Sequence, residues 1–203
     1  MRARLGDYSL RSFAFAGECQ LDAFVARAMA EERADIISIK PGINIMTNAS
    51  MSPRTFHSAL HGFLDILRDA GPETPIVVIS PIFQAPLAPA VPEFPPASLF
   101  RRLRRRWKMN ASGARPETAI GREGRKLTSP IIADLIQDVV TARQRAGDNT
   151  LRFLDGFSLL GPDQEALLPD GIHPSTEGHR LIGERFARLV FSPTVRPRQR
   201  RRA

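Results

Sequence analysis

Cysteine is almost absent from this chain of 203 residues, and long apolar runs are missing. Cys19 is the single cysteine, which excludes an internal disulfide and any cysteine-rich zinc or iron–sulfur site. The longest apolar run, residues 76–83, is interrupted by Ser80 and Pro81 and is far shorter than the roughly 18 to 20 residues of a membrane-spanning helix. The apolar stretch at 12–16 is also too short for a signal peptide. We therefore expect no spanning segment and, by default, a cytoplasmic protein.

Positive charge is concentrated in two places. The net charge is +8, from 29 Lys and Arg against 21 Asp and Glu. Six of the cations lie at 101–108, around Trp107, and five lie at 196–202. The remaining 18 Lys and Arg residues are outnumbered by the 21 Asp and Glu residues, so the rest of the chain is slightly acidic. The two basic segments are where an acidic partner, a membrane surface or a nucleic acid could bind.

Short apolar runs alternate with stretches of helical period. Strands are predicted at 12–16, 35–40, 76–80 and 151–155, with 41–44 as a loop. Helices are predicted after Asp22, with Phe24, Val25, Ala28 and Met29 on one face, from Ser52 to Gly71, from Ser129, and over 175–190. This alternation predicts an α/β protein whose parallel sheet is covered on both faces and binds ligands at the carboxyl ends of its strands.

The segment from Gln84 to about Lys126 does not fit this alternation. It contains a cluster of prolines, then the arginine cluster, then three glycines, which predicts a long insertion that leans toward disorder, with a short basic helix over 98–109. We therefore expect one domain at 1–190 with an insertion at about 84–126, followed by a basic disordered tail at 191–203.

Asp170 and His173 give the strongest local signal for chemistry, just before the last predicted helix. An Asp three residues ahead of a His in a tight turn can accept the proton of the imidazole Nδ1, which leaves Nε2 free to act as a general base. The pair would be two members of a catalytic triad. The structural alternative is a helix-capping turn with Pro174 at its entry and a solvated histidine.

Gly17 and Asn44 each follow a predicted strand, so both should lie at one edge of the sheet. A glycine N–H with no Cβ beside it and a side-chain amide are both suitable donors for an oxyanion hole. Either residue alone is typical of an ordinary turn or loop. Together with Asp170 and His173 they form one constellation of a base and oxyanion donors.

These residues carry a resemblance to a known family. Residues 15–22, 42–44 and 170–174 resemble the second, third and fifth sequence blocks of the SGNH, or GDSL-type, hydrolases, which are esterases and lipases of flavodoxin-like fold. The resemblance covers roughly 12–83 and 127–190. It implies that Gly17 and Asn44 are oxyanion donors, that His173 is the base and that Asp170 orients it. It implies no metal and no organic cofactor.

The chain departs from this family at its beginning. Family members start with a strand ending in Gly-Asp-Ser, whose serine is the nucleophile, and a helix and a second strand follow before the second block. The closest run here, residues 6–10, has Tyr8 inserted before Ser9, and the eight residues from Ser9 to Gly17 cannot hold a helix and a strand of ordinary length. We therefore expect a sheet without its first strand and an N-terminally truncated hydrolase. The nucleophile is unidentified, since this spacing disfavours Ser9.

The sequence thus predicts an ester hydrolase domain that acts on a small-molecule ester. The alternative is a non-catalytic hydrolase remnant that binds an acidic partner or a nucleic acid through its basic segments. His57 and His61 have the spacing of a metal pair on a helix, but no suitable third ligand lies near them, so they and His179 are interpreted as surface residues. The oligomeric state and the identity of the ester are not indicated.

Overall fold

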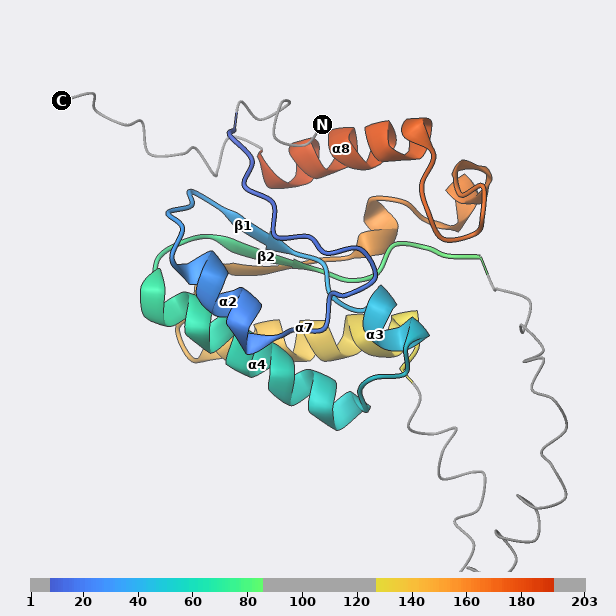
Figure 1. Cartoon of the computed structure of the whole chain (residues 1–203). Coiled ribbons are helices and arrows are strands. Elements are labelled where there is room, and N and C mark those ends of the chain that lie inside the picture. The colour runs from blue at the N-terminus through green and yellow to red at the C-terminus, as the bar shows by residue number, and fades with distance from the viewer. Residues whose placement is uncertain (1–7, 86–126, 192–203) are drawn as a thin grey trace, which may run out of the picture. The chain divides into compact units, whose positions relative to one another are not determined.

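Three parallel strands form the centre of the computed structural model, which describes residues 8–85 and 127–191. The strands are β1 (Ile37–Ile39), β2 (Ile76–Ile79) and β3 (Leu151–Leu154), in the order β1-β2-β3. Both neighbouring pairs are parallel (Figure 1). The predicted strands at 35–40, 76–80 and 151–155 are confirmed. Most of the predicted insertion and nearly all of the predicted tail lie outside the described residues.

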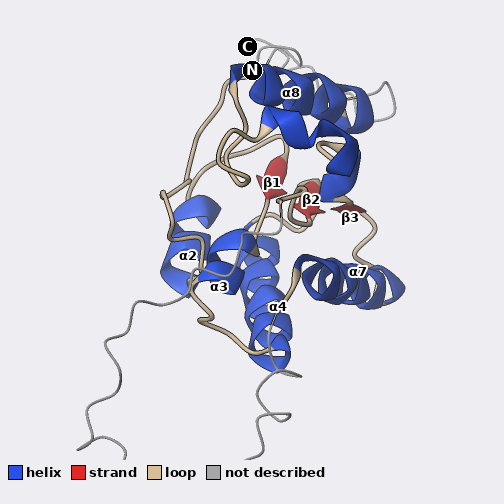
Figure 2. Ribbon diagram, turned by 90° about the vertical axis from the view of Figure 1, so that its right-hand side faces the viewer, coloured by secondary structure: helices blue, strands red, loops and turns tan. Residues whose placement is uncertain are grey.

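Helices cover both faces of this sheet (Figure 2). One face carries α4 (Pro53–Ala70) and α7 (Ser129–Arg145), with α2 (Ala23–Ala30) packed against α4. The other face carries α8 (Thr176–Val190). The connections contain the short helix α3 (Ile43–Thr47) and the 3₁₀ helices η1 (Gly156–Ser158) and η2 (Pro162–Leu167). The described part of the chain is therefore a three-layer α/β structure.

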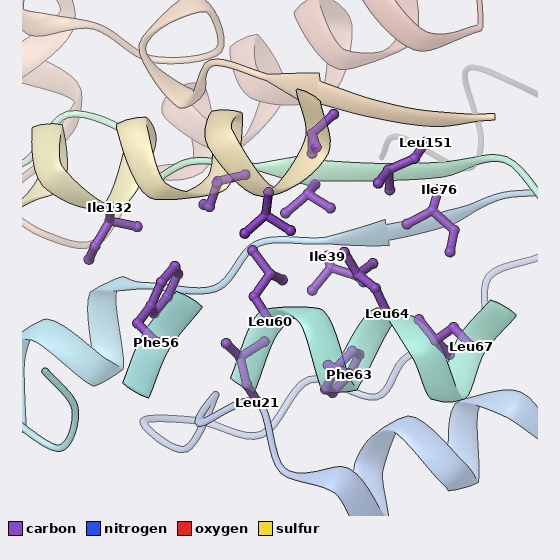
Figure 3. Close-up of a cluster of buried hydrophobic side chains, with 14 of the residues drawn as sticks. Leu21, Ile39, Phe56, Leu60, Phe63, Leu64, Leu67, Ile76, Ile132 and Leu151 are labelled. Atoms are coloured by element: carbon purple, nitrogen blue, oxygen red, sulfur yellow. The ribbon is translucent and has the colours of Figure 1, made fainter. Parts of the chain in front are cut away.

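Two apolar cores, one on each face, hold the layers together. β2 is buried along its whole length, and its side chains alternate between the cores. Ile76 and Val78 face α4 and α7, whereas Val77 and Ile79 face α8. Figure 3 shows side chains of α4, among them Leu60 and Leu64, pointing toward the sheet. A strand buried on both faces needs apolar residues at every position, which explains the unbroken run Ile-Val-Val-Ile.

Side-chain caps start the long helices where the sequence predicted. At the beginning of α4, Ser52 Oγ accepts the amide of Thr55, and Thr55 Oγ1 accepts the amide of Ser52 at 2.7 Å. Thr128 accepts the amide of Ile131 at the start of α7, and Ser175 accepts the amide of Gly178 at the start of α8. Each cap satisfies an amide that has no partner within its own helix.

The predicted strand at 12–16 is wrong. These residues form no strand, although Figure 1 shows this part of the chain running beside β1. Extended backbone becomes a strand only through a hydrogen-bonded neighbour, and within the described sheet β1 pairs with β2 alone. Phe15 is 56% exposed, so the apolar run is not buried either. Among the described residues, β1 is therefore the first strand along the chain.

Two further local predictions are corrected by burial. The predicted loop at 41–44 continues into α3, because a helical turn places Ile45 in the core, where it is fully buried. The predicted apolar face of α2 is rotated. Ala26 is fully buried and Val25 and Met29 are partly buried, whereas Phe24 is 65% exposed. A small residue at the α2–α4 contact lets the two helices approach closely.

An ion-pair network ties the helices together at the amino edge of the sheet. Arg68 Nε lies 3.0 and 2.9 Å from the two carboxylate oxygens of Asp148, and the Arg68 guanidinium also donates to Gly71 O and Thr150 Oγ1. Arg143 binds the same carboxylate at 3.4 Å. The side chains of Arg68 and Asp148 are only 11% and 12% exposed. Burial raises the pKa of Asp148, but the two guanidiniums outweigh this effect and hold the pKa below its usual value.

Asp148→Asn should lower the free energy of unfolding by about 3 kcal/mol at pH 7, because it leaves a buried guanidinium without its counter-charge. A carboxyl group with a lowered folded pKa stabilises fully above its unfolded pKa of about 4, and this stabilisation is lost as the pH falls through the folded pKa. Urea unfolding should therefore show a constant difference between wild type and variant from pH 7 to pH 5, which shrinks below about pH 4. A difference that persists unchanged to pH 2 would contradict this account.

Gly156→Ala tests the close approach of two loops after β2 and β3. A Cβ at this buried glycine would lie 2.2 Å from Ser80 O and 2.4 Å from Pro81 O, so we expect a loss of about 3 kcal/mol in unfolding free energy. Gly62→Ala is the matched control, since Gly62 is an exposed position of α4 and a Cβ there would meet nothing within 4 Å. It should stabilise by about 0.5–1 kcal/mol. Equal effects of the two variants in urea unfolding would refute the close approach.

Candidate active site

Asp170 and His173 are brought together in the turn between η2 and α8. His173 Nδ1 lies 2.6 Å from Asp170 Oδ2, and Asp170 Oδ1 accepts the amides of Ile172 at 2.9 Å and His173 at 2.7 Å. One carboxylate oxygen thus closes the turn while the other holds the imidazole. Because a carboxylate only accepts, Nδ1 carries the proton and Nε2 is left as the basic nitrogen.

The turn is open to solvent. The side chain of His173 is 79% exposed and that of Asp170 is 57% exposed. The backbone N–H of His173, followed by its imidazole and the N–H of Ile172, holds the pKa of Asp170 well below its usual range. Asp170 is therefore a carboxylate at any pH near neutrality. A carboxylate that orients a general-base histidine must be in this state.

Asn44 and Gly17 lie near the carboxyl end of β1. Asn44 is the second residue of α3 and is half-buried. Gly17 occupies an exposed turn with φ +75°, a conformation that favours glycine. This turn is placed by the residues after it, because the thiol of Cys19 contacts Lys40 O at 3.9 Å. Burial raises the pKa of the Cys19 thiol, which keeps it protonated and unreactive.

One short segment connects the neighbourhood of Asn44 with the Asp170–His173 turn. It comprises residues 80–85, which leave the carboxyl end of β2, and we call it the β2 exit segment. At one end, a Cβ on Gly42 would lie 2.9 Å from the ring of Pro81. At the other end, the amide of Ala85 donates to Gly171 O at 2.9 Å. The predicted oxyanion region and the predicted base therefore both adjoin this segment at the carboxyl edge of the sheet (Figure 1).

Ser9 is not brought to His173. Its neighbour Tyr8 stacks against Phe191, which caps the C-terminal end of α8, with ring centroids 4.5 Å apart. His173 precedes the N-terminal end of the same helix. A helix of 15 residues is about 22 Å long, so the two residues lie at opposite ends of α8.

The other histidines are placed as surface or half-buried side chains. The rings of His57 and His61 lie 4.9 Å apart on α4, and burial and the charge of His57 lower the pKa of His61. Over residues 8–85 and 127–191, no three His, Cys, Asp or Glu side chains are grouped to hold a metal ion. His179 is exposed on α8.

A cavity of about 470 Å³ lies at the amino edge of the sheet, away from the Asp170–His173 turn. It is lined by the ends of α2 and α4, among them Met29, Leu67 and Ala70, and by none of the candidate site residues. No helix in the described part of the chain is long and apolar enough to cross a membrane.

The sequence reasoning missed three polar residues at the carboxyl edge. Ser80 directly follows β2, Asp155 directly follows β3, and Gln84 lies further along the β2 exit segment. Gln84 Nε2 donates to Ser129 Oγ at 2.9 Å at the start of α7. The rule that selected Gly17 and Asn44, a polar or small residue after a predicted strand, passed over Ser80 and Asp155 because the predicted strands 76–80 and 151–155 end on them, whereas β2 and β3 end one residue earlier.

An oriented histidine at the carboxyl edge of a covered parallel sheet is typical of α/β hydrolytic enzymes that use a general base. The pattern of the GDSL-like lipase/acylhydrolase family matches residues 7–186, and this chain belongs to that family. The resemblance to the GDSL-type hydrolases that the sequence carries is therefore confirmed at the level of the family.

Comparison with solved structures gives the same fold. The salicylyl-acyltransferase SsfX3 from a tetracycline biosynthetic pathway matches with a TM-score of 0.70 and 25% identity, over 96% of this chain and 49% of its own. A structure described as a GDSL-like lipase from Bacteroides ovatus matches with a TM-score of 0.53 and 19% identity, over 85% of this chain and 39% of its own. The chain thus spans about half the length of the acyltransferase and less than half the length of the lipase. Comparison with curated proteins finds no match. The predicted flavodoxin-like SGNH fold class is confirmed.

Titration of the turn should separate the two roles of Asp170. Because the folded pKa of Asp170 is lowered, its hydrogen bonds should persist as the pH falls below about 4, and should break only when the folded carboxyl group is protonated. The amide resonances of Ile172 and His173, followed by NMR, should therefore show no transition near pH 4, where a carboxyl group of ordinary pKa is protonated.

Asp170→Asn should keep both amide bonds, because Asn Oδ1 still accepts, but it should lose the preference for a proton on His173 Nδ1. The ring ¹⁵N shifts of His173 report this tautomer directly. Amide resonances that titrate near pH 4 in the wild type would show that the turn does not hold the carboxylate.

Proposed function

We propose that this chain hydrolyses carboxylic esters, with His173 as general base, Asp170 as its orienting carboxylate, and Gly17 and Asn44 as oxyanion donors. The observation that carries the proposal is the 2.6 Å contact between His173 Nδ1 and Asp170 Oδ2 in an exposed turn at the carboxyl edge of the sheet. Membership of an acylhydrolase family supports the same reaction class. The substrate is a small-molecule ester, and no cofactor takes part in the proposed chemistry.

The proposed reaction follows from the orientation of the imidazole. His173 Nε2 removes the proton of a serine hydroxyl as its oxygen bonds to the ester carbonyl carbon. The negative charge then resides on the carbonyl oxygen, where the Gly17 N–H and Asn44 Nδ2 donate to it. The imidazolium returns its proton to the leaving alcohol as the ester bond breaks. Water, deprotonated by the same nitrogen, releases the acid and restores the serine.

Acyl transfer is the second candidate. The observation that favours it is the likeness to the salicylyl-acyltransferase, which covers nearly the whole of this chain. The two reactions share every step up to the acyl-enzyme and differ in whether water or another alcohol accepts the acyl group. Adding an alcohol such as glycerol to a p-nitrophenyl acetate assay and measuring the glyceryl ester formed distinguishes them.

Hydrolysis of p-nitrophenyl acetate tests the roles of the residues. His173→Gln should lower kcat by about 10²- to 10⁴-fold, because it removes the base. Asn44→Ala should lower kcat by about 10²- to 10³-fold with little effect on KM, because its amide acts on charge that develops in the transition state. His179→Gln, an exposed histidine on α8, is the matched control and should retain full activity. Unchanged turnover in Asn44→Ala would remove this residue from the site.

Labelling with a fluorophosphonate identifies the nucleophile. We expect one serine to be modified in the wild type and none in His173→Gln. Loss of labelling in Ser9→Ala would assign Ser9 and would require residues 8–16 to move from the position described above.

A folded chain that neither labels nor hydrolyses esters would overturn the hydrolase proposal. In that case, binding of a nucleic acid that weakens steeply with salt would support the non-catalytic alternative through the basic segments, which lie outside the described residues.

A further inference from the structure

A buried hydroxyl joins the ends of β2 and β3. Ser80 is only 1% exposed, and its Oγ donates to Asp155 Oδ1 at 3.1 Å while it accepts the amide of Gly156 at 2.8 Å. Asp155 Oδ1 also accepts the amide of Phe157 at 3.1 Å, at the start of η1. The Ser80 hydroxyl and the Asp155 carboxylate therefore accept backbone amides of the loop after β3 and are bonded to each other, which joins the two loops where the strands end.

The two loops are also in backbone contact. Gly156 is buried, and a side chain there would collide with the carbonyl oxygens of Ser80 and Pro81. Further along, the amide of Phe83 donates to Leu160 O at 2.9 Å. The first half of the β2 exit segment is thus held along its length against residues 155–160.

The far end of the β2 exit segment reaches the base. The amide of Ala85 donates to the carbonyl of Gly171, which lies between Asp170 and His173. Among the described residues, this is the backbone hydrogen bond that ties the turn to a distant part of the chain. The side chains of Asp170 and His173 are exposed, so this backbone bond links the turn to the β2 exit segment without any packing of those two side chains.

We propose that Asp155, acting through Ser80, is a positioning residue for His173. The Asp155 carboxylate fixes the start of the β2 exit segment, and the Ala85 amide at its end fixes the Asp170–His173 turn relative to the sheet. Because Pro81 also packs at Gly42, two residues before Asn44, the same segment sets the spacing between the predicted base and the predicted oxyanion donor. The catalytic consequence rests on the proposed function, whereas the geometric one does not.

Asp155 does not act on substrate in this proposal. Its Oδ1 is already shared by Ser80 Oγ and the Phe157 amide, so it works as a hydrogen-bond acceptor rather than as a charge. This distinction defines a matched pair of variants. Asp155→Asn keeps an acceptor oxygen in the same place, whereas Asp155→Ala removes it.

The experiment measures hydrogen exchange of the Ala85 amide and the amide and ring ¹⁵N shifts of His173, at a temperature where every variant is folded. Loss of one net hydrogen bond changes a local opening equilibrium by about tenfold. Asp155→Ala should therefore speed exchange at Ala85 by about tenfold and shift the His173 resonances. Asp155→Asn should leave both close to wild type.

Asp148→Asn is the control for a general loss of stability, since it removes a buried interaction at the opposite edge of the sheet. It should leave His173 unshifted. Equal His173 shifts in Asp148→Asn and Asp155→Ala, or no shift in Asp155→Ala, would overturn the positioning role.

Ester hydrolysis provides an independent measurement. With an active wild type, Asp155→Ala should lower kcat with little change in KM, and Asp155→Asn should restore most of it. An inactive wild type whose His173 resonances still respond to Asp155→Ala would contradict the proposed function and leave the positioning role supported. Full kcat in an Asp155→Ala protein with shifted His173 resonances would show that the turn's position does not govern catalysis.

Discussion

Parallel pairing of the three strands is the constraint on which the rest of this structure depends. Strands that run in the same direction all end at the same edge, so the residues that follow β1, β2 and β3 are gathered there, although they are far apart in the sequence. Asn44, Ser80 and Asp155 come together in this way. The start of α8, which packs on one face of the same sheet, adds His173 to that edge.

The two edges of the sheet differ in how far their charged side chains are buried. At the amino edge, Arg68 and Asp148 are nearly buried, and their ion pair joins the ends of α4, α7 and β3. At the carboxyl edge, Asp170 and His173 are exposed and are held by hydrogen bonds to the backbone of their own turn. The buried ion pair thus lies at the edge where no chemistry is proposed, whereas the side chains of Asp170 and His173 are open to solvent.

Backbone contacts hold the proposed site in place. The cavity described above lies at the other edge. The β2 exit segment contacts the loop after β3, the start of α7 and the Asp170–His173 turn, and so connects elements from three parts of the chain. In the proposed positioning role, Asp155 acts on this turn through the β2 exit segment without contacting it.

The sequence by itself determined the features that depend on neighbouring residues: the buried run of β2, the capped starts of α4, α7 and α8, and the contact of Asp170 with His173. Only the tertiary structure decided the features that need a distant partner. Residues 12–16 have the composition of a strand but no hydrogen-bonded pairing with one in the described sheet, and Asn44 is helical because Ile45 is buried. The bond between Ser80 and Asp155 joins residues 75 positions apart. Such pairs form because parallel strands bring separate segments to one edge, and no local pattern records which segments will meet.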